Sequence, residues 1–191
     1  MKSKLTLIIV IVVIVVLLAG ASLLYQLLTS SGPVGNTPGA LITGTPEQSR
    51  PDDSQLAPDI AIQDQEGNMV RLSDFSGEPV VLNYWASWCP PCVAEMPEFE
   101  QLYQEYGTQL QFIMLNDTDG QGETVEHATQ FVYEQGFTFP VYFDVNNEGA
   151  RAYDITAIPQ TFFIDRDGYI VSHTIGMIRE KDLREGIALI L

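Results

Sequence analysis

The most informative segment of the chain is Val80-Val81-Leu82-Asn83-Tyr84-Trp85-Ala86-Ser87-Trp88-Cys89-Pro90-Pro91-Cys92. Its first six residues are nearly all apolar, as expected of a central strand that is buried on both faces. A helical pattern then follows, so the two thiols lie at a strand-to-helix junction. Unpaired N–H groups and the dipole at a helix N-terminus favour a thiolate on Cys89. Cys92, one turn later, can attack a mixed disulfide on Cys89. The pattern therefore predicts reversible dithiol–disulfide chemistry by the only two cysteines of the chain.

Three other uses of the two cysteines are weaker. A zinc site needs about four ligands, and only His127 and His173 could complete it, neither in a second ligand pair. A structural disulfide across so short a loop constrains the unfolded chain little. Inert buried cysteines are disfavoured because two prolines between them make a poor helix interior. No motif surrounds either histidine, so both are expected to be structural, and no metal is expected.

Residues 5–28 are uncharged and mostly apolar, and Lys2 and Lys4 precede them. As a helix, this stretch would span about 36 Å, enough to cross a bilayer. The positive-inside rule places the N-terminus in the cytoplasm and the rest of the chain outside. The alternative is a signal peptide cleaved near Ala19-Gly20-Ala21, although the apolar run continues to Leu28. We therefore expect residues 1–28 to be an N-terminal membrane anchor (an uncleaved signal).

Residues 29–56 are rich in Ser, Gly, Pro, Thr and Asn and are predicted to be a flexible linker. An ordered hairpin around residues 40–42 is the alternative.

From Glu47 onward the chain carries a net charge of about −18, because all 25 acidic residues but only seven of the nine basic ones lie there. This charge argues against nucleic acid and anionic lipid head groups as partners. It would suit a basic substrate, although solubility is the commoner reason for such a charge.

Residues 57–191 alternate between strand and helix patterns and are predicted to form one domain. Strands are predicted at 59–62, 69–72, 80–85, 111–115, 141–143, 161–164 and 169–175, and helices at 91–106, 123–135, 148–153 and 180–191. Gly136 is expected to end the second helix. The β-α-β alternation, followed by a hairpin and a last helix, predicts a mixed sheet with helices on both faces.

The motif from Tyr84 to Cys92 resembles the thioredoxin active site, and Ala157-Ile158-Pro159-Gln160-Thr161 resembles the cis-proline loop of that fold. Leu72-Ser73-Asp74-Phe75, Asn83, Glu95, Pro97 and the insert 116–144 are similar to the TlpA/ResA-like membrane-anchored thiol–disulfide oxidoreductases. This resemblance covers roughly residues 56–191. It implies an α/β, thioredoxin-like mixed sheet flanked by helices, with an N-terminal hairpin, a central insert and a single N-terminal transmembrane helix.

The resemblance also implies roles for individual residues. Cys89 is expected to be the nucleophile and Cys92 the resolving thiol. Glu95 is either an acid in water near the helix N-terminus or a partly buried proton acceptor for Cys92. Asn83 stands where thioredoxins have an aspartate that exchanges protons.

Three residues are expected to bind the substrate. Pro159 is predicted to be cis, and Ile158 before it to offer its backbone groups to an extended peptide. Trp88 is expected to cover the site on its outer side, with plain surface packing as the alternative. No cofactor is expected besides the redox-active Cys89–Cys92 disulfide.

These features predict an extracytoplasmic enzyme that reduces protein disulfides. The resemblance implies apocytochrome c thiols as one substrate and a thiol-reducing transmembrane protein as the electron donor. A thiol peroxidase is the first alternative, although Ala86 stands where peroxiredoxins place a threonine. A disulfide-forming oxidase is the second, although no histidine lies between the cysteines to stabilise the thiolate. A redox-inert module and a copper-delivery protein are disfavoured by the intact cysteines and by the absence of a nearby histidine.

Overall fold

The computed structural model describes residues 55–118 and 122–191. The predicted anchor at 5–28, the hairpin alternative at 40–42 and nearly all of the predicted linker lie outside these residues. Within the two described ranges, no helix is long and apolar enough to cross a membrane.

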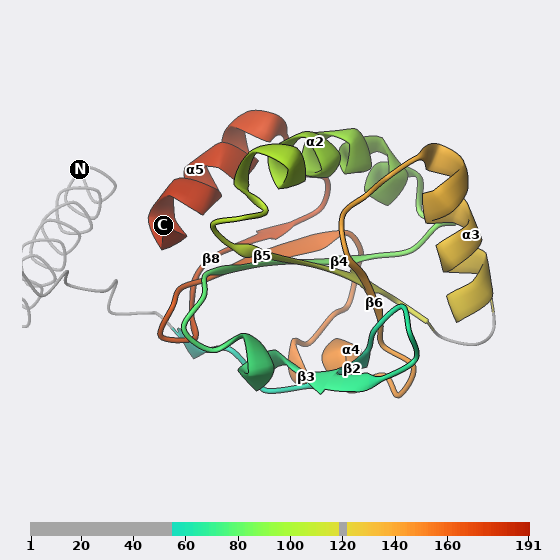
Figure 1. Ribbon diagram of the computed structural model, residues 1–191, viewed down its shortest axis with the longest axis horizontal. Helices are drawn as coiled ribbons and strands as arrows, with labels where there is room; N and C mark the ends of the chain where they lie inside the picture. Colours follow the sequence, from blue (N-terminus) through green and yellow to red (C-terminus); the bar gives the residue numbers. More distant parts are fainter. Residues whose placement is uncertain (1–54, 119–121) are drawn as a thin grey trace, which may run out of the picture. The chain divides into compact units, whose positions relative to one another are not determined.

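A single mixed sheet organises the described residues (Figure 1). Its strands follow the order β1-β8-β7-β4-β5-β6-β2-β3. The strands are β1 (Gln55–Leu56), β2 (Ala61–Gln63), β3 (Met69–Arg71), β4 (Val80–Trp85), β5 (Gln111–Asn116), β6 (Val141–Phe143), β7 (Gln160–Ile164) and β8 (Tyr169–Ile175). β4, β5 and β6 are parallel, and the other pairs are antiparallel.

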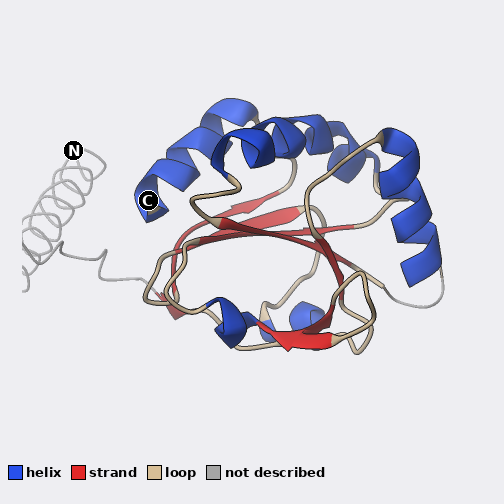
Figure 2. Cartoon of the chain, in the orientation of Figure 1, coloured by secondary structure: helices blue, strands red, loops and turns tan. Residues whose placement is uncertain are grey.

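Helices cover both faces of this sheet, as predicted (Figures 1 and 2). One face carries α2 (Pro90–Tyr106), α3 (Val125–Gln135) and α5 (Glu180–Ile190), and the other carries the 3₁₀ turn η1 (Leu72–Phe75) and α4 (Glu148–Ala152). Two apolar cores result, one for each face. β4 contributes to both, because alternate side chains of a strand point to opposite faces: Val81 and Trp85 pack toward α2, and Leu82 and Tyr84 pack on the other side.

Most predicted boundaries differ from the observed ones by one or two residues, and three of the differences have a clear physical reason. Gln55 and Leu56, assigned to the linker, form β1 and pair with Ile170 and Tyr169. α2 begins at Pro90, one residue earlier than predicted, since proline is well tolerated at the first helical position. α3 begins at Val125 and not at Glu123, because Thr124 has extended backbone and its hydroxyl caps the helix by accepting the His127 N–H at 3.1 Å.

The predicted end of α3 was correct. Gly136 closes the helix with φ of 73°, a left-handed conformation that glycine adopts without steric cost.

Strand pairing assembles the site. β4 lies between β5 and β7, and Asn83 on β4 stands opposite Thr161 on β7. The end of β4, the start of α2 and the start of β7 therefore meet at one edge of the sheet.

Candidate active site

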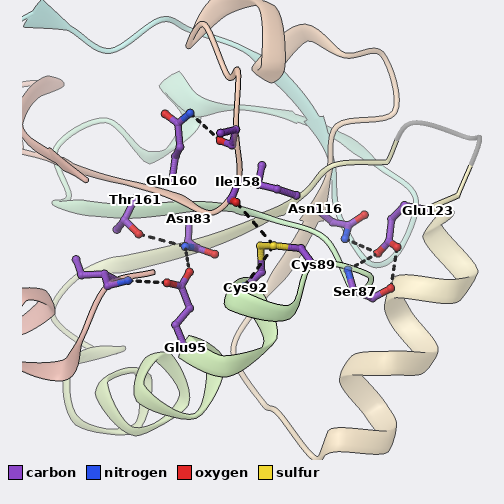
Figure 3. Close-up of a disulfide and its surroundings, with 12 residues drawn as sticks. Asn83, Ser87, Cys89, Cys92, Glu95, Asn116, Glu123, Ile158, Gln160 and Thr161 are labelled. Carbon is purple, nitrogen blue, oxygen red and sulfur yellow. Dashed lines mark hydrogen bonds between the residues drawn. A yellow bond between two sulfur atoms is a disulfide. The ribbon is translucent and has the colours of Figure 1, made fainter. Parts of the chain in front are cut away.

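Cys89 and Cys92 form a disulfide at the N-terminus of α2 (Figure 3). Cys89 is the N-cap residue, and its Sγ accepts the Cys92 N–H at 3.3 Å. Pro90 and Pro91 have no N–H to offer, so the Cys92 amide is the local backbone donor to this sulfur. Cys89 is 3% exposed and Cys92 is fully buried, so the N-terminal sulfur is the more accessible one.

The loop opposite the disulfide contains the predicted cis-proline. The Ile158–Pro159 peptide bond is cis, and the carbonyl oxygen of Ile158 lies 3.8 Å from Cys89 Sγ. On the other side of the loop, the Gly176 N–H donates to the Pro159 carbonyl at 2.8 Å. The structure thus brings the backbone of Ile158 to the nucleophile, while its role in binding a substrate peptide stays a prediction.

Glu95 is a buried carboxylate, only 1% exposed, so the interpretation as an acid in water was wrong. Cys92 and Glu95 are three residues apart on α2 and therefore share one face of the helix. Glu95 accepts hydrogen bonds from the Asn83 side-chain amide and from the Ile178 N–H, each at 2.8 Å. Burial raises the pKa of Glu95 to about 7, although both hydrogen bonds favour the ionised form. A carboxyl with this pKa can accept and release a proton near neutral pH.

Asn83 connects Glu95 to the sheet. Its amide nitrogen donates to Glu95 Oε1 at 2.8 Å and to Thr161 Oγ1 at 3.1 Å. Its buried amide oxygen has no hydrogen-bond partner among the described residues. Figure 3 shows Asn83 and Glu95 on the same side of the disulfide. Asn83 therefore orients the titratable carboxyl without exchanging a proton itself.

A second buried carboxylate, Glu123, holds the loop before the nucleophile, and the sequence did not indicate this role. Glu123 is fully buried and accepts hydrogen bonds from the Ser87 N–H at 3.0 Å and the Ser87 hydroxyl at 2.7 Å. It also accepts a bond from the Asn116 side chain at 2.8 Å. These contacts tie the loop two residues before Cys89 to the central insert, on the other side of the disulfide from Glu95 (Figure 3). A Ser two residues before Cys89 was the available signal, but its partner lies 36 residues away.

Trp88 is the remaining predicted site residue, and the two histidines were expected to be structural. Trp88, next to Cys89, is 54% exposed, so its part in covering the site or binding a substrate stays a prediction. His173 stacks on Phe162 with ring centroids 4.2 Å apart, and His127 Nδ1 lies 3.7 Å from Glu123 Oε2. Within the ranges 55–118 and 122–191, no group of three or more His, Cys, Asp or Glu side chains is arranged to hold a metal ion.

Together these groups can perform thiol–disulfide exchange. Cys89 is the N-cap residue of α2, and the buried Cys92 lies one turn later. A carboxyl that titrates near neutral pH lies on the same helix face, and a backbone carbonyl lies beside Cys89 Sγ.

Comparisons with known proteins agree with this chemistry. The model of the AhpC/TSA family matches residues 54–173, more than half of the chain. The thiol-disulfide oxidoreductase ResA of Geobacillus thermodenitrificans is 34% identical over 130 residues, which are 68% of this chain and 72% of that protein.

Two solved structures are also similar to this chain. A protein of Chlorobium tepidum, assigned as a thiol:disulfide interchange protein DsbE, is 30% identical with a TM-score of 0.64, covering 72% of this chain and 96% of its own. StoA of Bacillus subtilis is 25% identical with a TM-score of 0.60, covering 69% of this chain and 98% of its own.

Proposed function

The chain belongs to the AhpC/TSA family as a thioredoxin-like thiol–disulfide oxidoreductase of the ResA type, and on this premise we propose that it reduces protein disulfides outside the cytoplasm. The observation that carries the proposal is Glu95, a buried carboxyl with a pKa of about 7 one turn after Cys92. In the reducing direction Cys92 must lose its proton before it can attack. A carboxylate that titrates near neutral pH is suited to take that proton.

The reduction proceeds in two balanced steps. The Cys89 thiolate attacks one sulfur of a substrate disulfide, and the other substrate sulfur leaves as a thiolate that takes a proton from water. Cys92 then gives its proton to Glu95, and its thiolate attacks Cys89 Sγ. The Cys89–Cys92 disulfide forms, and the second substrate sulfur leaves as a thiolate. Two electrons have passed to the substrate, and an external dithiol must return them.

The spacer between the cysteines supports the proposed reducing direction. Pro90 and Pro91 donate no hydrogen bond to the Cys89 sulfur and carry no positive charge. The Cys89 thiolate is therefore stabilised less than it would be beside a histidine. A less stabilised thiolate makes the dithiol a better reductant.

The proposed substrates are extended protein segments that contain a disulfide. Ile158, whose carbonyl lies 3.8 Å from Cys89 Sγ, supplies backbone groups that pair with any such segment. The negative charge of the chain favours basic partners. Apocytochrome c, whose haem-attachment thiols must be reduced, is the substrate we propose first, and a thiol-reducing transmembrane protein is the proposed donor.

We further propose a single-pass membrane location through residues 5–28, with the N-terminus in the cytoplasm and the catalytic domain outside the cell membrane. This follows from the two lysines before the apolar stretch. A membrane-impermeant maleimide added to intact cells that express the full chain should label the reduced cysteines. Labelling only after lysis would reject the proposed location.

The test of the activity uses the purified full-length protein. Equilibration with dithiothreitol couples gives the reduction potential, which we expect to lie near that of thioredoxin, about −270 mV, and well below the oxidising value of about −120 mV. The reduced protein should also reduce an oxidised Cys-x-x-Cys-His peptide at a rate that rises as Glu95 ionises around pH 7. A potential near −120 mV would favour the oxidase alternative. Rapid consumption of hydrogen peroxide with no peptide reduction would favour the peroxidase.

A further inference from the structure

The cis-proline loop is supported from behind by Gln160, the first residue of β7. Gln160 is 1% exposed, and its side-chain nitrogen donates to the Ala157 carbonyl at 2.8 Å. Its side-chain oxygen lies 2.8 Å from His173 Nε2 on β8. Ala157 directly precedes Ile158, whose carbonyl faces Cys89. A chain of two hydrogen bonds therefore runs from β8 to the loop that faces the nucleophile, and Figure 3 shows the part that starts at Gln160.

The chemistry of these groups fixes the direction of both bonds. A carbonyl can only accept, so the amide nitrogen of Gln160 must face Ala157 and its oxygen must face His173. His173 Nε2 must then carry a hydrogen. Burial lowers the pKa of His173, so the neutral ring with its proton on Nε2 is the form present at neutral pH. The ring is held in place by stacking on Phe162, with an angle of 6° between the ring planes.

We propose that Gln160 and His173 are positioning residues for substrate binding, which rests on the proposed reduction of protein disulfides. They fix the Ala157 carbonyl and thereby hold the backbone of Ile158 in the position where an extended substrate pairs with it. Neither side chain reacts with a sulfur. Their effect therefore falls on substrates that use the loop backbone, and a small aromatic disulfide does not sense it.

Three variants of the full-length protein separate this role from general folding. Gln160→Met keeps the side-chain volume and removes both hydrogen bonds. His173→Phe keeps the stacking on Phe162 and removes the donor. His173→Gln is the matched control, since its amide nitrogen replaces Nε2 as a donor. The His173 side chain is only partly buried, and the rest of it is open to solvent, so these changes at β8 are compatible with folding.

The variants are compared with insulin as a protein disulfide and with 5,5′-dithiobis(2-nitrobenzoate) as a small one. The net contribution of one neutral hydrogen bond corresponds to about a three- to tenfold change, and we expect a rise in KM for insulin of at least this size in Gln160→Met. His173→Phe should move KM in the same direction, and adding it to Gln160→Met should cause no further rise, because both variants break one chain of bonds. In Gln160→Met and His173→Phe, we expect wild-type values for the rate with the small disulfide, for kcat with insulin and for the reduction potential. In His173→Gln, which keeps a donor to Gln160, we expect a wild-type KM for insulin as well.

Hydrogen exchange at Gly176 provides a readout that needs no enzyme activity. The Gly176 N–H donates to the Pro159 carbonyl, so a loosened loop should raise its exchange rate about three- to tenfold in Gln160→Met. An unchanged KM and exchange rate would overturn the proposed positioning role, as would an equal loss with the small disulfide. A third outcome separates the two proposals. If the wild type does not reduce insulin but Gly176 exchanges faster in Gln160→Met, the proposed function is rejected, while the conclusion that Gln160 supports the loop still holds.

Discussion

Replacing Glu95 by Gln should remove the contribution of this carboxyl to the pH dependence of stability, which falls between pH 4.5 and 7. Glu95 has a pKa of about 7 in the folded protein against an ordinary value of 4.5. Below pH 4.5 the carboxyl is protonated in both states and does not affect folding. Between the two values the folded state keeps the proton while the unfolded state loses it, so the free energy of unfolding falls as pH rises. Above pH 7 the loss is complete.

The size of the effect follows from the two pKa values. Each pH unit between them corresponds to about 1.4 kcal/mol, so Glu95 lowers the free energy of unfolding by about 3 kcal/mol at pH 8 relative to pH 4. Glutamine does not titrate and accepts with only one of its two terminal atoms. It therefore loses one of the bonds from Asn83 and Ile178, a constant cost of about 0.5–1.5 kcal/mol at every pH.

The measurement is urea unfolding of the oxidised wild type and variant at pH 4, 5, 6, 7 and 8. The wild type should be more stable than Glu95→Gln at pH 4 and less stable at pH 8. Glu126→Gln, which removes an exposed carboxylate on α3, is the control for the loss of one acidic side chain. Parallel stability curves for wild type and Glu95→Gln would refute the argument, since Glu95 would then have an ordinary pKa in the folded protein.

Three further predictions concern the cysteines and the groups around them. Cys92→Ser should trap substrates as mixed disulfides on Cys89, visible as adducts on non-reducing gels, and trapping by Cys89→Ser instead would reverse their roles. Glu123→Gln should lower the free energy of unfolding by about 1–3 kcal/mol, because the half-buried Ser87 donors lose one carboxylate oxygen of the buried Glu123, and it should slow reduction of protein disulfides; urea unfolding with an unchanged midpoint would contradict this. Pro90→His adds a cation beside the nucleophile, so it should lower the Cys89 pKa and raise the reduction potential by roughly 30 mV for each tenfold gain in thiolate stability. Alkylation rates against pH and redox equilibration measure both quantities, and an unchanged potential would mean that the spacer does not control the reducing power.

Local pattern was enough to predict most of the architecture. β4 is a run of apolar residues long enough for one buried strand, and its observed range matches the predicted one. The hairpin of β7 and β8 follows from the turn residues 165–168, where Gly168 has φ of 85°. These elements depend on neighbours in sequence, whose spacing can be read directly. The boundary at 55–56 was wrong because pairing with β8 overrides local preference there, and the start of α3 was wrong because Thr124, not a residue before Glu123, caps the helix.

Residue pattern alone identified the redox pair and the strand-to-helix junction that holds it, and resemblance identified the cis bond before Pro159. The roles of the polar side chains around that pair depend on tertiary packing. The pattern left open whether Glu95 is exposed to water or buried. The contact with Ile178, which lies 83 residues later in the chain, shows that it is buried. The contact of Glu123 with Ser87 likewise spans 36 residues. Burial and hydrogen-bond partners set the pKa of a carboxyl, and both come from segments that meet only when the sheet and helices have packed.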